Sequence, residues 1–409
     1  MATERPLCFP KILQGPTTLR KTVWEGSWSD AAFVPRTGTA EYFLILDSSE
    51  SSGILRALET LHSQYEDFLS ARNLTGQEII FSRLYLSDIA NQESVLPDSK
   101  LYRRLSAGAV SLIEQRPLKK GPVALFAYFA TPFRQKLSRN VPNGKAGCPN
   151  ESLVIGDHYR MLWLAAFKGD GIEDAEGQTG DLLKNATAAL KDRNMRWLPN
   201  ALRSWIFVRD IDADYEKMVR SRREFFHRHG LTDCTRYLAS TGIEGQLSHP
   251  GSRVGMDMLC LDGLDPAQIT KMEALDSLSS ANMYGATFER GLRIDFGDRI
   301  HLHISGTASI GQSGELLHPR DVEKQTERTL QNLQALLAAQ GSSYSDLAYV
   351  FVYLRDPTSE SQVRRMLQPR LPPDLPRLFL EARVCRPGWL VEIEGFAVKS
   401  HASPFKPFF

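Results

Sequence analysis

Three residue types near the end of the chain have the chemistry to handle a small organic acid. Arg377 precedes Glu392 by fifteen residues, and Cys385 and Glu394 lie close to the same glutamate. An arginine guanidinium binds a carboxylate through two parallel hydrogen bonds. A glutamate on an adjacent strand supplies or takes a proton when its surroundings tune its pKa. This set therefore indicates a site that binds a small carboxylate and transfers a proton.

The two glutamates belong to one apolar run, Leu390 to Val398. Because they alternate along it, we expect the two side chains to point to opposite faces of one strand. Under that expectation Glu392 is the acid, and Glu394 is a solvated or structural carboxylate. Two alternatives stay open: Arg377 could pair structurally with a carboxylate, and Cys385 could be a small buried hydrophobic residue.

The elements that must position these residues recur along the chain. A helix, a strand that ends in aspartate and a second helix occur three times, with the strands ending at Asp88, Asp210 and Asp356. We expect these aspartates to cap turns rather than to catalyse. A hydrophobic strand precedes each recurrence and another follows it. This indicates an α+β fold in which three copies of one unit, a mixed sheet with two helices on one face, are fused as a pseudo-trimer.

The predicted boundaries follow from these recurrences and from two stretches that interrupt them. Residues 1–38 lack periodicity and are predicted to form an arm, and residues 136–157, which are rich in Pro, Gly and Asn, are predicted to be a loop insertion. The units are then 39–135, 158–275 and 276–400. Only the third unit pairs an arginine with a strand glutamate, so we expect it to hold the active site and the other two to be degenerate.

Composition excludes several classes of partner. Lys+Arg 49 against Asp+Glu 48 gives a formal charge of +1, and no basic run suggests nucleic-acid binding. No apolar stretch is long enough to span a membrane, and the first ten residues lack the layout of a secretory signal. The five cysteines are scattered, which indicates reduced thiols and a cytoplasmic protein. No metal is expected, because the pairs His227/His229 and His301/His303 have no third ligand nearby.

The C-terminal residues resemble the Rid (reactive-intermediate-deaminase) superfamily from Tyr284 to about Lys399. The resemblance rests on Ile304–Ile310, Gly314, Gln325–Leu336, Val350–Asp356 and Val391–Glu394. Family members are typically trimers with binding clefts between neighbours, so the resemblance implies that three fused units form a monomer. It also implies that Arg377 binds the substrate carboxylate and that Tyr284 lines the same cleft.

A longer stretch, from about Arg203 to Lys399, is similar to the chorismatases, longer relatives with a Rid-like C-terminal half. The similar segments are Arg203–Tyr215, Arg222–Phe226, Ser240–Gly245, Tyr284–Gly291 and Cys385–Gly395. Chorismatases release pyruvate from chorismate and leave a hydroxybenzoate or a dihydrodiol acid. In that family an acidic residue seven positions after a cysteine protonates the enolpyruvyl methylene. The resemblance therefore implies catalytic roles for Glu392 and Cys385, with no metal or nucleotide cofactor.

The resemblance also implies the substrate contacts. Besides Arg377, these are Tyr284, Arg290, Thr241, Gly242 and Ala308. Tyr284 and Arg290 could instead pack at an interface, and the segment from Thr241 to Ile243 could be a plain turn. The neighbouring pair Arg222 and Arg223 is expected to lie on a solvated helix face.

Three functions are open on the sequence. The first is a chorismatase-like lyase or hydrolase of secondary metabolism. The second is an imine or enamine deaminase that uses Arg377 for the carboxylate and Glu392 for the attacking water. The third is a non-catalytic protein that binds a small acid. The similar segments from Arg203 to Gly245 lie outside the last unit and favour the first function.

Overall fold

The structure is a computed structural model that describes residues 19–24, 28–48, 53–119, 121–140, 150–169, 174–247 and 251–409, without the side chains of Asn282 and Tyr284. Its strands form three six-stranded sheets. Numbered within each sheet, the strands lie in the order 1-2-3-6-4-5 in all three. The fourth and fifth strands of each sheet are parallel, and the other pairs are antiparallel. The predicted α+β fold built from three copies of one unit is confirmed.

Each sheet takes its six strands from one continuous part of the chain. The first contains β1 (Leu19–Trp24), β2 (Trp28–Phe33), β3 (Ala40–Asp47), β4 (Ile79–Leu86), β5 (Ala109–Glu114) and β6 (Val123–Thr131). The second contains β7 (Gln135–Arg139), β8 (Asn150–Ile155), β9 (Arg160–Lys168), β10 (Ala201–Val208), β11 (Ala239–Glu244) and β12 (Val254–Asp262). The third contains β13 (Ile269–Lys271), β14 (Gly291–Asp295), β15 (Arg299–Ala308), β16 (Leu347–Leu354), β17 (Arg377–Glu381) and β18 (Val391–Ser400).

Helices follow the third and fourth strands of each unit. They are α1 (Ile54–Arg72), α2 (Ile89–Gln92), α3 (Lys100–Leu105), α4 (Ala175–Asp192), α5 (Trp197–Asn200), α6 (Ile211–Arg228), α7 (Val322–Ala338) and α8 (Glu360–Leu367). The capping prediction is confirmed, because Asp88 and Asp210 accept hydrogen bonds at the start of α2 and α6, and Asp356 accepts one from Thr358 N before α8. The recurring aspartate therefore starts the segment after each fourth strand.

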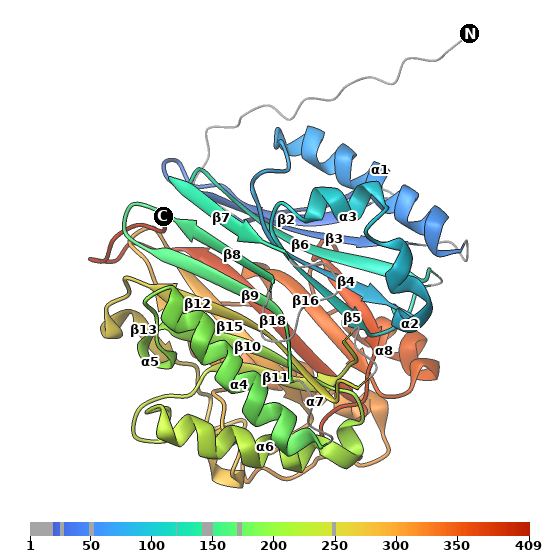
Figure 1. The fold of residues 1–409 in the computed structure, drawn as a ribbon. Coiled ribbons are helices and arrows are strands. Elements are labelled where there is room, and N and C mark those ends of the chain that lie inside the picture. The colour runs from blue at the N-terminus through green and yellow to red at the C-terminus, as the bar shows by residue number, and fades with distance from the viewer. Residues whose placement is uncertain are drawn as a thin grey trace.

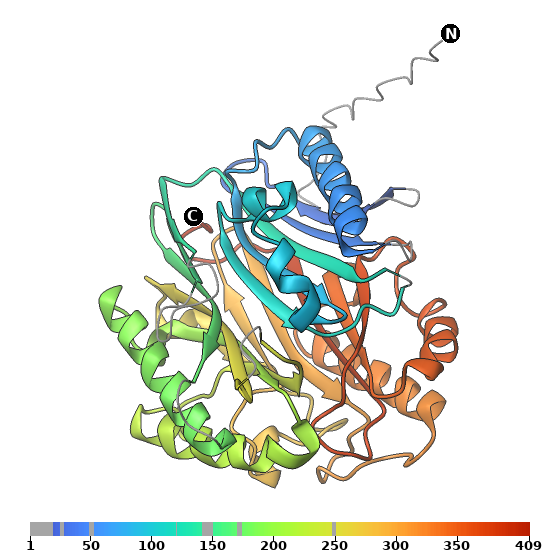
Figure 2. The ribbon, with the colours of Figure 1, turned by 45° about the vertical axis from the view of Figure 1, so that its right-hand side comes forward.

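The three sheets enclose a shared core, and the long helices lie on the outside (Figures 1 and 2). Aromatic side chains join the units across this core. The Phe81 and Trp163 rings stack with centroids 4.3 Å apart, and the Phe126 and Tyr349 centroids are 4.7 Å apart. Separate clusters of apolar residues hold the helices of the first and second units to the outer faces of their own sheets. Each sheet is thus buried on both faces, which explains why the central strands are apolar throughout.

A buried arginine–carboxylate pair joins each two neighbouring units. The pairs are Arg83–Asp257 (2.7 Å), Arg203–Glu394 (2.6 Å) and Arg299–Glu41 (2.7 Å), from the first–second, second–third and third–first junctions. All six side chains are at most 3% exposed. Breaking such a pair leaves an uncompensated buried charge, so each pair specifies how two units meet.

Three predicted boundaries are wrong. Residues 19–24 and 28–33 are not part of an arm, because β1 and β2 extend the first sheet at its edge. The predicted loop at 136–157 contains most of β7 and β8, which extend the second sheet, while residues 141–149 lie outside the described part. β13 falls before the predicted start of the third unit, yet Ile269 pairs with Ile294 in the third sheet.

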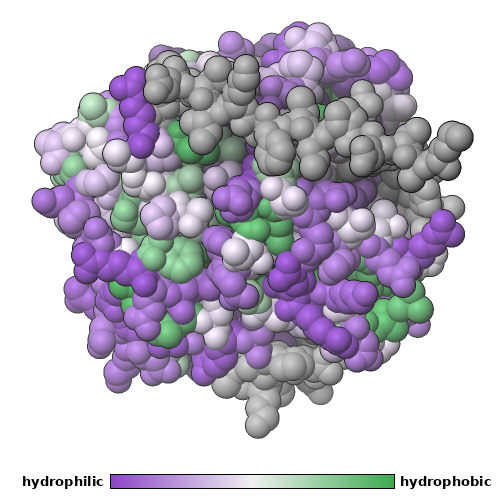
Figure 3. Space-filling model, turned by 90° about the horizontal axis from the view of Figure 1, so that it is seen from above, coloured by the Kyte–Doolittle hydropathy of each residue, from purple (hydrophilic) through white to green (hydrophobic). Residues whose placement is uncertain are grey.

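The face in Figure 3 is mostly hydrophilic, and its apolar patches are small and separate. Among the described residues, no helix is long and apolar enough to cross a membrane.

Candidate active site

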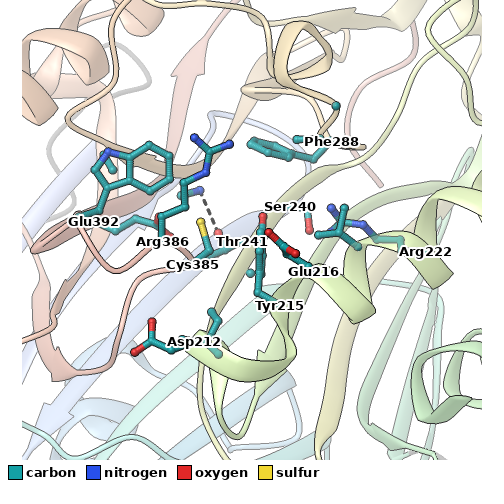
Figure 4. Close-up of a pocket in the computed structure, with 18 of the residues that line it drawn as sticks. Asp212, Tyr215, Glu216, Arg222, Ser240, Thr241, Phe288, Cys385, Arg386 and Glu392 are labelled. Atoms are coloured by element: carbon teal, nitrogen blue, oxygen red, sulfur yellow. Dashed lines mark hydrogen bonds between the residues drawn. The ribbon is translucent and has the colours of Figure 1, made fainter. Parts of the chain in front are cut away.

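A cavity of about 580 Å³ opens between the second and third units. The second unit supplies one wall from α6 and β11. The third unit supplies the other wall from β15, β18, the segment 285–290 and the loop 385–389. Figure 4 shows side chains from both walls turned toward the same space. The site therefore exists only where two units meet.

Glu392 of β18 lies in the wall of this cavity and is 5% exposed. Its carboxyl group occupies space that is free only because residue 306 of β15 is glycine; a Cβ atom on Gly306 would collide with Glu392 Oε1. Burial, and next the nearby negative charge of Glu394, raise the pKa of Glu392 to about 8. Glu392 is therefore protonated at neutral pH and has the properties of a general acid.

The predicted orientation of Glu394 is wrong. Side chains alternate along a strand with a period of two, so residues 392 and 394 share a face. Both carboxyl groups lie on the face toward the second unit, where Glu392 reaches the cavity and Glu394 reaches Arg203 of β10. Glu394 is not solvated; it is a buried carboxylate beside the acid.

Cys385 lies in the loop before β18 and also lines the cavity. Burial, and then the charge of Glu392, raise the pKa of the thiol to about 12, although a hydrogen bond with Tyr215 acts against the shift. A thiol that stays protonated is a weak nucleophile. Cys385 therefore contributes a small, uncharged part of the cavity wall beside Glu392.

The expectation that Arg222 lies on a solvated helix face is wrong. It lies in α6, is 2% exposed, and lines the cavity instead of a solvated helix face. Its Nε donates to Thr287 Oγ1 at 2.9 Å, while its buried Nη2 has no hydrogen-bond partner among the described residues. Burial lowers the pKa of Arg222 from its usual high value. A buried guanidinium with a free donor is suited to an anionic ligand.

A sequence signal for Arg222 existed. Met218 and Phe226 lie four residues before and after it, and both are buried on the inner face of α6. Residues four apart share a helix face, so the position of Arg222 is on the apolar side of the helix. An arginine at such a position indicates either a buried ion pair or a ligand.

The structure brings together most of the other predicted residues. Thr241 and Gly242 of β11, Arg290 and Ala308 all line the cavity. Arg290 is held by Ser279, whose carbonyl oxygen accepts from Nε at 2.9 Å. Gly242 leaves room for Tyr215, because a Cβ atom there would lie 3.3 Å from the tyrosine ring.

One predicted contact is not brought to the cavity, and another lies outside the described side chains. Arg377 starts β17 on the other side of the third unit, and its guanidinium donates to the carbonyl oxygens of Leu375 and Pro372 at 3.2 and 2.7 Å. It is not among the cavity residues, so the expected pairing with Glu392 is absent there. The side chain of Tyr284 lies outside the described part, although the adjacent Gly285 lines the cavity.

The cavity is cationic overall. Its basic residues are Arg220, Arg222, Arg223, Arg290 and Arg386, and its acidic residues are Asp212, Glu216 and Glu392. Because Glu392 is protonated at neutral pH, five positive charges face two negative ones. Among the described residues, no group of three or more His, Cys, Asp or Glu side chains is placed to hold a metal ion. The arrangement can bind an anion and deliver one proton to it.

Residues 295–399 match the family described as Endoribonuclease L-PSP. The third unit is a Rid-type domain. The family resemblance predicted for this part of the chain is confirmed.

Two further matches cover more of the chain than the Rid-type domain does. A 3-hydroxybenzoate synthase from Streptomyces hygroscopicus is 27% identical over 219 residues, a match that covers 48% of this chain and 63% of that protein. The chain thus matches less than two thirds of the length of this relative. A crystal structure described as chorismatase is similar with a TM-score of 0.58 at 18% identity, covering 78% of this chain and 93% of that one. That likeness shows that the three-unit fold is shared.

A Rid family protein of unknown function, YyfA from Yersinia pestis, is 23% identical and covers 32% of this chain and 98% of its own, with a TM-score of 0.28.

Proposed function

We propose that the protein is a chorismatase-like enzyme that releases pyruvate from chorismate, or from a related enolpyruvyl acid, and leaves a hydroxybenzoate. The observation that carries the proposal is Glu392, a buried carboxyl group in the wall of a cationic cavity, where burial raises its pKa to about 8. The relative named 3-hydroxybenzoate synthase favours the 3-hydroxy isomer among the possible products.

The reaction begins with proton transfer from Glu392 to the methylene carbon of the enolpyruvyl group. The carbon that bears the ether oxygen then becomes an oxocarbenium-like centre, which a ring hydroxyl or water attacks. Attack by water gives a hemiketal, which breaks its ether bond to release pyruvate and the dihydrodiol acid. Attack by the ring hydroxyl gives a cyclic ketal, and in both routes the proton lost by the attacking oxygen returns to the Glu392 carboxylate. The ketal then loses the ring proton beside the ether oxygen as the hydroxyl's own bond to the ring breaks, which makes the ring aromatic. The remaining hemiketal breaks down to pyruvate and the hydroxybenzoate, whose phenol oxygen takes up a proton in place of the one the ring lost. Hydroxybenzoate and pyruvate together contain all the atoms of chorismate, so that route consumes no net water; a dihydrodiol product consumes one.

Arginines would hold the substrate, since chorismate carries two carboxylates. Arg222 offers a free buried donor in the second unit, and Arg290 approaches from the third unit. A dianion bound between them would bridge both walls and place its enolpyruvyl group against Glu392. Binding through two arginines also fixes orientation, which lowers the entropic part of the barrier.

The direct test is to incubate the protein with chorismate and to measure both products. Pyruvate is followed through lactate dehydrogenase and the aromatic acid by chromatography against the 2-, 3- and 4-hydroxybenzoate standards. We expect one hydroxybenzoate for each pyruvate. Absence of pyruvate release from chorismate and from related enolpyruvyl acids would overturn the proposal.

The imine deaminase alternative loses its main support. It required Arg377 beside Glu392, and Arg377 lies outside the cavity. Parallel incubation with 2-aminoacrylate, generated in place, separates the two activities, because only a deaminase accelerates ammonia release from it.

A further inference from the structure

Glu394 has the most complete set of hydrogen-bond donors in the second–third junction. Its oxygens accept from Arg203 Nη2 at 2.6 Å, Trp205 Nε1 at 2.9 Å and the Tyr353 hydroxyl at 3.0 Å, and also from the Thr241 hydroxyl. The side chain is 2% exposed. Four donors on one buried carboxyl group, one of them a guanidinium, are the surroundings of an ionised carboxylate.

This fixed charge is tied to the acid through the backbone of β15. Thr241 Oγ1 donates to Glu394 and accepts from Gly306 N at 3.0 Å. Gly306 in turn lies against the carboxyl group of Glu392, where a Cβ atom would collide with it. Glu392 and Glu394 are therefore neighbours on one face of β18. Gly306 of β15 lies against Glu392, and Thr241 of β11 bonds to Glu394.

The charged groups that act on Glu392 come from several elements. Besides Glu394 they are Arg203 and Arg290, which favour its ionised form, whereas Glu394 opposes it. Tyr353 of β16 lies opposite Glu392 in the sheet. The remaining titratable groups of the cavity wall lie before β18 and in α6. They are Cys385 and Arg386, and Asp212, Tyr215, Glu216, Arg220, Arg222 and Arg223. Of these groups, only Glu394 shares both the strand and the face of the acid.

We propose that Glu394 is a positioning residue whose ionised carboxylate, fixed by Arg203, Trp205, Tyr353 and Thr241, keeps Glu392 protonated and ready to donate. Two carboxylates two positions apart on a buried strand face cannot both ionise cheaply, and the one with four donors holds the charge. The inference rests on the proposed function only in giving Glu392 a proton to donate. The electrostatic relation holds for the free protein as well.

The first–second junction provides a matched control. Asp257 there corresponds by register to Glu394, since each lies opposite the fifth residue of its neighbouring strand, Trp205 or Phe351. Asp257 pairs with Arg83 at 2.7 Å and accepts from Ser111 Oγ at 2.9 Å.

Ser111 corresponds to Thr241 in the same way. Each lies opposite the fifth residue of the fourth strand of its own unit, Arg83 or Trp205. The residue two positions before Asp257 is Gly255, so this charge has no acid beside it. A change at Asp257 therefore disturbs a junction of the same design without touching Glu392.

The experiment compares the pH dependence of kcat for wild type, Glu394→Gln and Asp257→Asn. In wild type, the plot of kcat against pH should have an alkaline limb, a fall in activity as Glu392 ionises near its pKa of about 8. In Glu394→Gln that limb should move to lower pH by about one unit or more, because the repelling charge is gone and Arg203 is unpaired. Asp257→Asn should leave it in place, whatever it does to the melting temperature. An unmoved limb in Glu394→Gln, or an equal shift in both variants, would overturn the proposal.

A second variant covers loss of folding in Glu394→Gln. Arg203→Met/Glu394→Leu removes the buried pair together, a replacement that proteins often tolerate. The limb should still move to lower pH, but by less, because Glu394 acts on Glu392 more strongly than Arg203 does.

Infrared titration of the free protein tests the relation without any substrate. The protonated carboxyl band of Glu392, assigned by its loss in Glu392→Gln, should disappear at lower pH in Glu394→Gln than in wild type. If wild type releases no pyruvate, the proposed function fails, yet this titration still decides whether Glu394 controls Glu392.

Discussion

The first–second and second–third junctions share one design and differ in the residue two positions before the buried carboxylate. In both, an edge-strand hydroxyl and a buried arginine hold a carboxylate of the next unit, Asp257 in one and Glu394 in the other. Two positions earlier the first–second junction has Gly255, and the second–third junction has Glu392. A Cβ atom on Gly255 would collide with Leu247, whereas Glu392 faces open space. The second–third junction thus differs from the first–second junction in two ways. It has an acid at this position, and no side chain equivalent to Leu247 fills the space beside it.

The third–first junction shows the apolar version. Its residues at the matching positions are Phe126 and Ala124 of β6, facing the part of the core occupied by Phe351. Its buried pair, Arg299–Glu41, comes from other strands and also engages His301. The third–first junction therefore departs from the design that the other two share, and it has no acid at the position of Glu392.

The largest effect should come from Glu392→Gln. Glutamine keeps the size and hydrogen bonding of the side chain but has no proton to donate, so kcat should fall by about 10²–10⁴-fold. Pyruvate release measures the loss, and a thermal melt checks the fold. Glu244→Gln, at the end of β11 and outside the cavity residues, is the control and should stay within about twofold of wild type. Full activity in Glu392→Gln would place the acid elsewhere.

The same substitution should stabilise the protein at alkaline pH. The pKa of Glu392 is about 8 in the folded protein against 4.5 for an ordinary glutamate, so folding favours the protonated form. Wild type then loses stability from about pH 4.5, where the unfolded chain releases this proton, to about pH 8, where the folded protein also does. Each pKa unit is worth about 1.4 kcal/mol, so the free energy of unfolding of Glu392→Gln should gain several kcal/mol on wild type.

Urea denaturation of both proteins at about pH 5 and about pH 9 measures that gain. A parallel pH dependence for the two would show that Glu392 has an ordinary pKa.

Arg222→Met should separate binding from stability. Loss of a charge-assisted hydrogen bond to a substrate carboxylate costs about 1.5–3 kcal/mol, so KM should rise about tenfold or more. The melting temperature should stay level or rise, because a buried and incompletely paired cation is removed. Arg228→Met, on the exposed face of the same helix, controls for loss of charge. An unchanged KM would remove Arg222 from substrate binding.

The smallest effect should come from Arg377→Lys. This arginine bonds to backbone carbonyl groups at the start of β17, so we expect a stability loss of about 1 kcal/mol and a KM within about twofold of wild type. A tenfold rise in KM would instead indicate that the substrate binds at the third–first junction.

The fold could be predicted where patterns repeat and not where strands are exposed. The central strands are buried on both faces, and the capping aspartates mark each unit, so sequence reasoning found both. β1 and β7 are edge strands with mostly exposed or half-buried residues, and they carry no apolar alternation to detect. Their pairing depends on the neighbouring strand and not on their own residue pattern.

The site was predicted as far as motif spacing reaches. Glu392 and Cys385 were found because they lie seven residues apart in a recognisable segment. Arg377 was paired with Glu392 because both belong to one unit. Yet β17, which Arg377 starts, lies beside β3 of the first unit, whereas Glu392 lines a cavity shared with the second unit. Arg222 was missed because its position four residues from Met218 and Phe226, on the apolar side of α6, was not taken as a sign of burial.

The cavity has both its walls in one polypeptide, from Ile211 to Gly242 and from Gly285 to Glu392. A cleft between separate subunits disappears when dilution separates them, and its activity per molecule then depends on protein concentration. Here the connecting segments hold the two walls at a fixed effective concentration. The specific activity should therefore stay constant under dilution, and a substitution in one wall alters one site instead of three symmetric copies.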